Sequence, residues 1–343
     1  MNYLIFRTDR IGDFLITSSL INAIKRNDEE AKIYIVASNK NESFVKRYDF
    51  VEKVFSLNSN KLIDKINLFF KLRKYKFDNI IISDKKNRSI ILGIILKSKK
   101  KIFNVSKKTQ KNILKIFYKN VILDNDNLKD RTLLNILSEN CETLGIDFKD
   151  EDFHYLSLDK FKNKFLNGEL INLDNIKFIL FHYDEKWELK NYSKVFKRAT
   201  NLTDINVKEE TFMKFLLDLS EHSSKIIILT TGNISTSIIE KIKNTSLKIN
   251  DSLYEIRLKD RKAYLLVNES FFSISYLIAK SSLFISCHGA FTHIASNYKV
   301  KILDVIEQNK VFHYSKITKH MKNYKSLYRD NFEKLSKNII NNL

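Results

Sequence analysis

The chain of 343 residues is long enough for two domains of ordinary size, and its 43% hydrophobic content is enough to build a core in each. No apolar run reaches the roughly 18 residues of a membrane-spanning helix, we expect no secretory leader, and Cys141 and Cys287 give neither a disulfide framework nor a zinc spacing. The net charge of +20 is compatible with nucleic acid, anionic lipid or phosphorylated substrates as partners.

In the first half of the chain, short β-rich runs alternate with longer helical patterns, which predicts parallel β–α–β units. Near-continuous apolar strands such as Ile80–Ile82 are typical of a sheet covered on both faces. The predicted strands are Asn2–Arg7, Lys32–Ala37, Lys53–Leu57, Asn79–Ser83, Lys101–Val105 and Asn120–Leu123, and the predicted helices are Asp13–Arg26, Asn41–Tyr48, Lys61–Lys74 and Lys108–Phe117.

The first strand pattern runs into "RTDRIGDFLITSSL", Arg7–Leu20, where a helix is predicted to begin near Gly12 or Asp13. Asp is a common helix N-cap, and the pattern alone favours that role for Asp13. The same carboxylate could accept a proton from a substrate hydroxyl. Gly12 permits close backbone approach or an unusual φ. Arg7 and Arg10 are suited to a carboxylate or phosphate, with solvent exposure as the alternative, and the absence of Gly-x-Gly-x-x-Gly argues against a dinucleotide site.

A helix is predicted at Lys129–Leu144, with Gly145 as its C-cap, and the polar segment Asp147–Asp152 is interpreted as a linker. The alternation then restarts, which predicts domains at 1–150 and 151–325. A terminal helix within 326–343, Ser326–Asn342, could pack back on the first domain. The second-half strands are Lys177–His182, Lys225–Thr230, Ala263–Val267, Leu283–Ser286 and Lys301–Val305, and the helices are Glu209–Glu221, Ser235–Lys243 and Ser273–Lys280.

The segment "SLFISCHGAFTHIASNYKVKILDVI", Ser282–Ile306, takes a predicted strand through a small-residue turn into a helix that starts near Phe291 or Thr292. Backbone N–H groups at such a helix start form an anion site. His288 and His293 flank the turn, and the alternative is a structural turn with one buried histidine. The sequence does not favour zinc, because no further Cys or His pattern completes a ligand set, and nothing shows that Cys287 is an activated nucleophile.

Two further loops follow predicted strands of the second half. In "FILFHYDEKWELKNYS", Phe178–Ser193, Lys186 could meet a phosphate and Trp187 could anchor the next helix, although a solvated lysine is the ordinary role. In "IIILTTGN", Ile226–Asn233, Gly232 follows a strand at a place that suits a nucleotide contact.

Three segments together resemble the family 9 glycosyltransferases, the heptosyltransferases of lipopolysaccharide assembly. "YLIFRTDRIGDFLITSSLINAIKR" resembles their N-terminal signature with its Gly-Asp pair, and "SENCETLGID" resembles their interdomain helix. "SISYLIAKSSLFISCHGAFTHIASNYKVKILDVI" is similar to their donor segment, usually Asp-Ser/Thr-Gly-x-x-His-x-Ala. The resemblance covers both halves of the chain in their order.

The resemblance implies an α/β fold of the GT-B type, with two Rossmann-like domains facing across a cleft. The first would hold the acceptor and the second the nucleotide-sugar, which is a co-substrate, so that neither a cofactor nor a metal is implied. The implied reaction inverts the anomeric centre. Asp13 matches the catalytic base. The implied donor residues are Lys186, Gly232, His288, Gly289, Ala290, Thr292 and His293, and the implied acceptor residues are Arg7, Arg10 and Gly12.

The donor segment departs from the family pattern, because an ungapped match puts the family's Asp on His288, its Ser/Thr on Gly289 and its Gly on Ala290. The sugar is therefore open, heptose or another. The lysine-rich composition extends through a chain without proline, so we interpret much of the charge as compositional bias. We expect a cytoplasmic enzyme with an anionic glycan or glycolipid acceptor, peripheral at the inner membrane.

Two other functions remain open from the sequence. A basic α/β protein could bind nucleic acid, and "SKKKIFNVSKKTQKNILKIFYK", Ser98–Lys119, is the best segment for that role. It is more often a solvated helix face, and we expect no nucleic-acid partner. The altered donor segment also suits a relative that binds sugar nucleotides without turnover.

Overall fold

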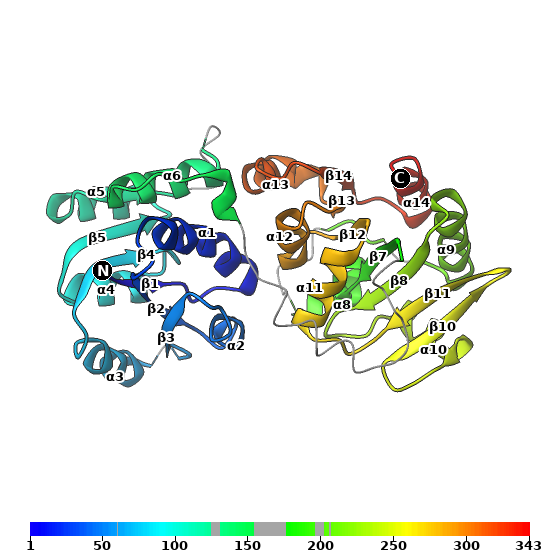
Figure 1. Cartoon of the computed structure of the whole chain (residues 1–343), viewed down its shortest axis with the longest axis horizontal. Coiled ribbons are helices and arrows are strands. Elements are labelled where there is room, and N and C mark those ends of the chain that lie inside the picture. Colours follow the sequence, from blue (N-terminus) through cyan, green and yellow to red (C-terminus); the bar gives the residue numbers. More distant parts are fainter. Residues whose placement is uncertain (60, 125–130, 154–175, 196–201, 206) are drawn as a thin grey trace. The chain divides into compact units, whose positions relative to one another are not determined.

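The chain forms two compact units, Met1–Leu156 and Ser157–Leu343, in a computed structural model that describes residues 1–59, 61–124, 131–153, 176–195, 202–205 and 207–343. Each unit is built around a sheet of its own (Figure 1). The units are therefore described one at a time.

The first unit holds a six-stranded sheet in the order β3-β2-β1-β4-β5-β6, with every pairing parallel. This is the strand order of a Rossmann fold, in which ligands bind beyond the carboxyl ends of the strands where the order reverses. That switch point lies between β1 and β4. The strands are β1 (Asn2–Phe6), β2 (Lys32–Ala37), β3 (Val51–Ser56), β4 (Phe77–Ile82), β5 (Ser98–Val105) and β6 (Val121–Leu123).

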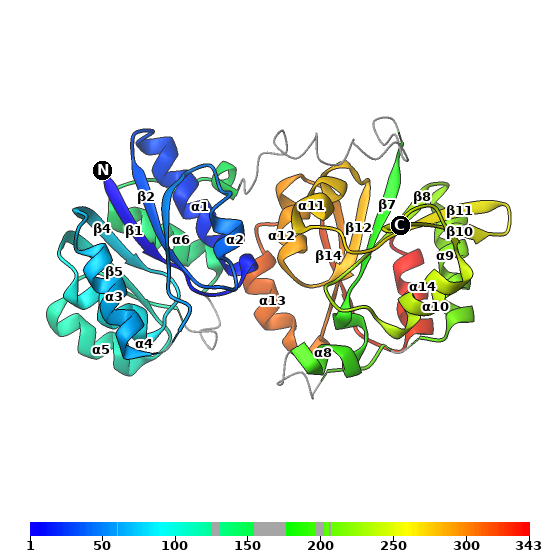
Figure 2. The same cartoon turned by 90° about the horizontal axis from the view of Figure 1, so that it is seen from below.

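Helices cover both faces of this sheet, with α3, α4 and α5 on one face and α1, α2 and α6 on the other (Figures 1 and 2). Residues 4–6 of β1 and 80–82 of β4 expose none of their surface, which explains their continuous apolar sequence. The helices are α1 (Ile11–Asn27), α2 (Glu42–Val45), α3 (Leu62–Leu72), α4 (Asn87–Ile95), α5 (Lys108–Phe117) and α6 (Leu133–Leu144).

Two helices of this unit differ from the prediction. α4 was not predicted, because its isoleucine-rich run is apolar on nearly every side and shows no clear helical period. The helix predicted to start at Lys129 starts at Leu133 within the described residues, while 129 and 130 lie outside them. Its end is confirmed, since Gly145 is the C-cap and has a φ of 81°.

The second unit holds an eight-stranded sheet in the order β14-β13-β12-β7-β8-β11-β10-β9. The pairings from β14 to β11 are parallel, and the switch point lies between β7 and β12. The strands are β7 (Phe178–Tyr183), β8 (Ile226–Thr231), β9 (Leu247–Lys248), β10 (Leu253–Leu258), β11 (Arg261–Leu266), β12 (Leu283–Cys287), β13 (Lys301–Ile306) and β14 (Tyr324–Tyr328). The α-helices are α8 (Leu189–Val195), α9 (Glu209–Ser223), α10 (Ser237–Thr245), α11 (Phe271–Lys280), α12 (Ala290–Asn297), α13 (Val311–Thr318) and α14 (Phe332–Ile340).

One edge of this sheet is antiparallel, contrary to the expected run of parallel units. β10 pairs antiparallel with β11, and β9 pairs antiparallel with β10. The two-residue turn between β10 and β11 is Lys259-Asp260, with Lys259 at a φ of 54°. The usual glycine of such a turn is missing, so the hairpin left no signal in the sequence.

The predicted terminal helix, Ser326–Asn342, is wrong in its first part. The segment Tyr324–Tyr328 is β14, a parallel edge strand beside β13, and the helix begins only at Phe332. Phe332, Leu335 and Ile339 belong to the core of the second unit, and the packing of the terminal helix on the first unit stays a prediction. The apolar spacing that predicted the helix is the one that packs it against α9 and β14.

The predicted linker Asp147–Asp152 is instead packed against α1. Asp152 is 2% exposed and lies in a short 3-10 turn, Asp150–Phe153. Its carboxylate accepts hydrogen bonds from Nε and Nη2 of Arg26, both at 2.9 Å, and from the N–H of Lys149 at 2.7 Å. The acidic run was interpreted as a solvated linker, but one of its residues, Asp152, is buried and pairs with Arg26 of α1.

Replacing Asp152 should lower the stability of the first unit, because Asp152→Ala leaves the Arg26 guanidinium without its buried partner. We expect a loss of about 2 kcal/mol in the free energy of unfolding, measured by urea denaturation. Glu151→Ala is the matched control. Its carboxylate lies 3.6 Å from the same guanidinium but is 65% exposed, so we expect less than about 0.5 kcal/mol. Equal losses in the two variants would contradict a structural role for this segment.

Candidate functional site

Asp13 lies at the start of α1, just beyond the carboxyl end of β1. The N-cap is Arg10 and the helix begins at Ile11, so Asp13 is the third helical residue rather than the cap itself. Its Oδ2 accepts a hydrogen bond from the backbone N–H of Arg10 at 3.2 Å, as the third residue of a capping box does. The side chain is half-buried. The carboxylate is thus held in a fixed place at the switch point of the sheet and still reaches solvent.

Gly12 is the second residue of α1 and is half-buried. The unusual φ that its position suggested is absent, since Gly145 is the glycine with positive φ in the described chain. Gly12 therefore leaves the first turn of the helix without a side chain beside Asp13. Its contact with an acceptor stays a prediction.

Arg7 is buried and ties the turn after β1 to its neighbours. Its Nε donates to the carbonyl oxygen of Asp13 at 2.9 Å, and its Nη1 donates to the carbonyl oxygen of Ser83 at 2.5 Å. These bonds join the ends of β1 and β4 to the start of α1. Arg10, by contrast, is exposed at the helix start. The predicted acceptor contacts of both arginines stay predictions, and the geometry suits Arg10 better.

A cluster that the sequence analysis missed surrounds this turn. The Thr8 hydroxyl donates to Asp84 Oδ2 at 2.5 Å and accepts from Lys86 Nζ and Arg88 Nη2, each at 3.0 Å. Lys86 Nζ also lies 2.5 Å from Asp9 Oδ1. The signal was available in "SDKKNR", residues 83–88, because this charged run directly follows β4, and β4 borders β1 at the switch point.

Three carboxylates meet near this switch point, and they differ in their partners. Asp9 is paired with Lys86 and lies 3.4 Å from Arg7 Nη1. Asp84 is buried and accepts from Thr8 and from the Ser89 hydroxyl at 2.7 Å. Asp13 forms no ion pair with any residue that the structure describes. Of the three carboxylates, Asp13 is therefore the one available to accept a proton from a substrate.

In the second unit, Lys186 joins the turns that follow β7 and β12. Its Nζ lies 2.9 Å from Asp184 Oδ2 and donates to the carbonyl oxygens of Cys287 at 2.9 Å and His288 at 3.0 Å. Burial on its own would lower the pKa of Lys186, but the Asp184 carboxylate together with smaller contributions from Cys287 and Tyr192 raises the pKa overall. The three ammonium protons thus have protein acceptors. The predicted phosphate contact stays a prediction, and the structure gives this amine the task of holding the β12 turn.

The two predicted glycines of this unit make room for the same turns. A Cβ on Gly289 would lie 2.7 Å from Lys186 Nζ, and a Cβ on Gly232 would lie 2.8 Å from the Cβ of Asp184. At Gly232 the close approach of the Asp184 backbone leaves no room for a side chain, whereas at Gly289 a side chain would displace the Lys186 amine from its present position. Trp187 completes that turn, because it is fully buried and its Nε1 donates to the carbonyl oxygen of His182 at 3.0 Å.

A buried carboxylate on β13, Asp304, organises the predicted donor segment and was missed. It exposes none of its surface and lies beside Nδ1 of His288 at 2.6 Å, the Thr292 hydroxyl at 3.1 Å and the Tyr324 hydroxyl at 2.9 Å. Burial and then the Asp304 charge raise the pKa of Tyr324, which stays protonated and donates. An aspartate inside the apolar run "KILDVI" was the signal for such a hub.

α12 starts at Ala290, with Gly289 as its N-cap, one residue earlier than predicted. The N–H of Gly289 donates to the Thr292 hydroxyl at 3.2 Å. His293 is buried, and burial together with His288 and His320 lowers its pKa well below the ordinary value, so its ring is neutral. The structure thus brings His288, Gly289, Ala290, Thr292 and His293 together at one helix start. Their contacts with a donor stay predictions.

Cys287 is buried beside this turn, and burial raises the pKa of its thiol to about 12. The thiol is therefore protonated at neutral pH and is not an activated nucleophile.

A small pocket of about 50 Å³ opens between the ends of β12 and β13, and Lys310, Tyr314 and Arg329 line it together with Lys186 and His288. Arg329 is buried, with its Nε 2.9 Å from Glu307 Oε1 and its Nη1 donating to the carbonyl oxygen of Lys186 at 2.8 Å. Its Nη2 has no hydrogen-bond partner within the described residues. A buried guanidinium with an unused donor suits an anion.

No cluster of three His, Cys, Asp or Glu side chains suited to a metal occurs in the described parts of the chain. Metal-independent transfer stays a prediction.

Comparison with known proteins supports the resemblance. No protein-family model matches the chain. The lipopolysaccharide heptosyltransferase 1 of Campylobacter coli is 22% identical over 257 residues, which are 72% of this chain and 74% of that protein. The chain also superposes on the E. coli heptosyltransferase WaaC with ADP-2-deoxy-2-fluoro heptose, with a TM-score of 0.62, 15% identity and coverage of 99% and 97% of the two chains.

A second solved structure, the E. coli ADP-heptose lipopolysaccharide heptosyltransferase II, matches with a TM-score of 0.66, 11% identity and coverage of 99% and 98%. At these identities the structures establish the fold, which is GT-B with two Rossmann-like units, as predicted. The relative in sequence adds that the chain is heptosyltransferase-like.

The second unit should lose stability in mild acid because His182 and His293 are buried as neutral rings. Burial lowers the pKa of His182 to about 4, whereas the unfolded chain takes up the proton near about 6.5. Between these values the unfolded state binds more protons, so the free energy of unfolding falls as the pH falls. For His182 we expect a loss of about 2 kcal/mol between about pH 7 and about pH 5.

Urea unfolding of His182→Gln at the two pH values measures this loss, since the variant keeps a polar side chain beside Thr230 and removes the titrating ring. His222→Gln, at an exposed position, is the control. We expect the first variant to flatten the pH dependence and the second to leave it unchanged. A parent-like pH dependence in His182→Gln would contradict the assignment.

Proposed function

We propose that this heptosyltransferase-like chain is a glycosyltransferase that moves a sugar, heptose or another, from a nucleotide-sugar to a hydroxyl of lipopolysaccharide or another cell-surface glycan. The observation that carries the proposal is the pair of switch points, each at the carboxyl edge of a Rossmann sheet. One carries a carboxylate without an ion pair among the described residues, and the other carries a cationic, glycine-lined turn at a helix start.

In the proposed reaction, the acceptor hydroxyl oxygen attacks the anomeric carbon from the face opposite the leaving group. Asp13 takes the hydroxyl proton, the new glycosidic C–O bond forms, and the bond from the anomeric carbon to the diphosphate oxygen breaks with its electron pair on that oxygen. The anomeric centre inverts. General-base assistance of this kind contributes about 10²–10⁴ in rate.

The departing diphosphate gains negative charge, which the second unit is built to compensate without a metal. The N–H groups at the start of α12 and the helix dipole favour an anion. Arg329, with an Nη2 that no described residue uses, and Lys310 at the same pocket add positive charge. We assign Lys186 to holding this cradle in shape, because its protons are already taken up by the turns that it joins.

His288 offers an explanation for the departure from the family's donor motif. Where the family has a carboxylate, this chain has an imidazole whose Nδ1 lies 2.6 Å from the buried carboxylate of Asp304. We propose that Nε2 of this ring contacts a hydroxyl of the donor, with Asp304 fixing the ring. The change alters the contact without removing polar recognition, and it favours turnover over a degenerate site.

The acceptor is proposed to be an anionic glycan or glycolipid. Arg10, Lys86 and Arg88 gather positive charge around the turn that carries Asp13, and such groups hold phosphate or carboxylate. A glycolipid acceptor would bring the protein to a membrane, and we propose a cytoplasmic location with peripheral contact at the inner face.

Asp13→Asn tests the proposal directly. The amide oxygen can still accept from the N–H of Arg10, so we expect a folded protein that binds the donor but transfers sugar about 10²–10⁴ times more slowly. Transfer is measured as acceptor-dependent release of nucleoside diphosphate, with ADP-heptose and a panel of other nucleotide-sugars as donors.

Asp9→Asn is the matched control, because this carboxylate lies in the same turn but is already paired with Lys86. We expect it to retain most of the transfer rate. Full activity in Asp13→Asn, or no release of nucleoside diphosphate from any donor by the parent, would overturn the proposed function.

A further inference from the structure

The described chain contains no helix that is both long and apolar enough to span a bilayer, yet one face of the first unit is apolar. Ten of the sixteen large, exposed hydrophobic side chains of the described residues lie on α3, α4 and α5. They are Leu62, Ile63, Ile66 and Phe70 on α3, Ile91, Ile94 and Ile95 on α4, and Ile113, Ile116 and Phe117 on α5. We call this set the apolar face.

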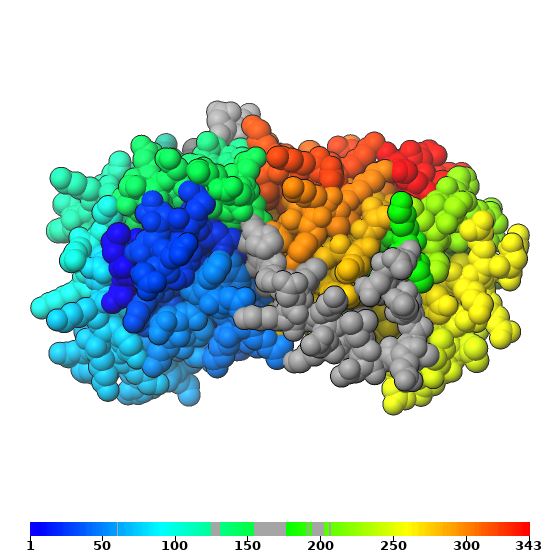
Figure 3. Space-filling model, in the orientation of Figure 1, coloured from blue at the N-terminus to red at the C-terminus, as the bar shows by residue number. Residues whose placement is uncertain are grey.

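The apolar face is continuous across the three helices. Within each helix its residues recur at spacings of three and four, so they share one side of that helix. α3 packs against α4, and Gln110 on α5 donates to Asn87 Oδ1 on α4 at 2.8 Å. All three cover the same side of the sheet (Figures 1 and 2). In Figure 3, the cyan to blue-green colours of this part of the chain appear along the left edge of the first unit.

These residues are surplus to the core. Each helix already buries other side chains against the sheet, such as Leu68 and Leu72 on α3 and Leu114 on α5. Ile116 and Phe117 remain 74% and 76% exposed. An exposed apolar patch of this kind on a folded domain marks a contact with another phase or molecule.

The segment that carries the apolar face is strongly basic, so the net charge is concentrated in this part of the chain rather than spread along it as the composition suggested. Residues 61–119 hold 18 lysines and arginines against three acidic residues, and so contribute +15 of the net charge of +20. On α5, Lys108, Lys111 and Lys115 form one side of the helix, while the exposed apolar residues form the other. Basic and apolar residues side by side on a helix are typical of binding at a lipid surface.

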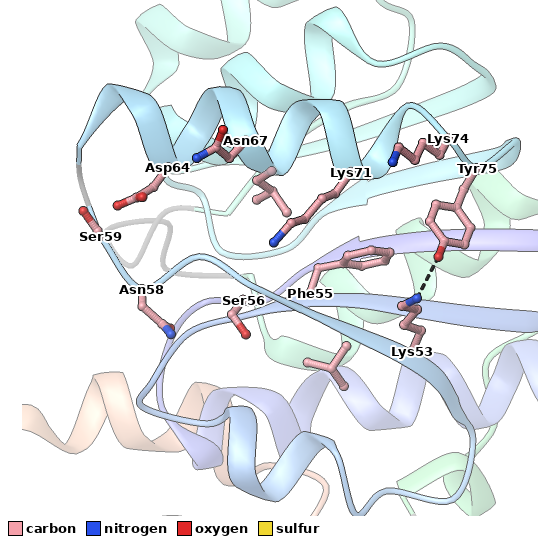
Figure 4. A pocket seen from close by; sticks show the side chains of 12 residues that line it. Lys53, Phe55, Ser56, Asn58, Ser59, Asp64, Asn67, Lys71, Lys74 and Tyr75 are labelled. Carbon is pink, nitrogen blue, oxygen red and sulfur yellow. Dashed lines mark hydrogen bonds between the residues drawn. The ribbon is translucent and has the colours of Figure 1, made fainter.

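A pocket of about 680 Å³ between β3 and α3 adjoins the apolar face. Lys53, Lys71 and Lys74 line it, with Asp64 as the one acidic lining residue, and Figure 4 shows Lys71 reaching from α3 toward β3. Lys53 Nζ donates to the Tyr75 hydroxyl at 2.8 Å at the end of the pocket. A recess of this charge at the edge of an apolar surface suits a lipid phosphate.

We propose that α3, α4 and α5 dock on an anionic lipid bilayer, with their isoleucine, leucine and phenylalanine side chains inserted among the lipids and the surrounding lysines against the headgroups. The β3–α3 pocket takes a headgroup phosphate. A second copy of the chain fits less well, because two such basic faces repel each other. Nucleic acid fits less well, because the outward residues are mainly aliphatic and offer few rings on which bases stack.

The inference deepens the peripheral contact in the proposed function, and its test uses lipid binding without any sugar. The full chain is sedimented with vesicles of phosphatidylcholine alone or with phosphatidylglycerol added. We expect binding to the anionic vesicles, little to the neutral ones, and a decrease as salt rises. Ile116→Ser/Phe117→Ser and Lys108→Glu/Lys115→Glu should each reduce binding at least about fivefold while melting and circular dichroism stay unchanged.

The matched controls are Leu247→Ser, an exposed leucine of the second unit, and Lys337→Glu, an exposed lysine of α14. Both should bind as the parent does. In Phe117→Trp, the new fluorescence should shift to the blue on binding, since Trp187 is fully buried and contributes a constant background. Transfer to a soluble acceptor should be unaffected in the apolar variants, which separates docking from catalysis.

Absence of binding to anionic vesicles would overturn the docking proposal, as would parent-like binding by both double variants. Binding to generic DNA that exceeds vesicle binding and is lost in the same variants would assign the face to nucleic acid instead.

Discussion

The Lys186 ammonium is the interaction on which the candidate donor site depends. It joins the turn after β7, through Asp184, to the turn after β12, through the carbonyl oxygens of Cys287 and His288. Those two strands meet at the switch point of the sheet, where the chain must leave the sheet in two directions. The carbonyl oxygens of this turn would repel an anion, but they accept hydrogen bonds from the ammonium instead. The N–H groups at the start of the following helix remain available to an anion. Gly289 suits this arrangement, because a side chain there would displace the amine.

In the first unit, the turns at the switch point are held together by side chains of both charges. Arg7 fixes main-chain oxygens, Lys86 neutralises Asp9, and Thr8 links Asp84 to two cations. These contacts fix Arg7, Asp9 and Asp84 in rigid pairings, whereas Asp13 forms no ion pair with any described residue. A proton acceptor needs both a fixed position and a carboxylate without a cationic partner. The hydrogen bond from the N–H of Arg10 fixes Asp13, and no described residue forms an ion pair with it. The two units therefore share a Rossmann strand order but carry opposite chemistry at their switch points.

The sequence predicted much of this arrangement and missed what depends on contacts distant in the chain. The strands were predictable because buried parallel strands are continuously apolar, and the Asp13 and His288 turns because each follows such a strand. Asp304 and Arg329 were missed because their role appears only when β13 and β14 lie beside β12. α4 was missed because the outward isoleucines that make its surface unusual also hide its period.

The most direct test of the central claim is hydrogen–deuterium exchange of the full chain with and without ADP, UDP or GDP. We expect at least one of the three nucleotides to bind and to slow exchange in residues 182–192, 286–293 and 303–314. These residues include the turns after β7, β12 and β13, which would surround the diphosphate. Unchanged exchange in these turns with every nucleotide, or slowing confined to the first unit, would contradict it.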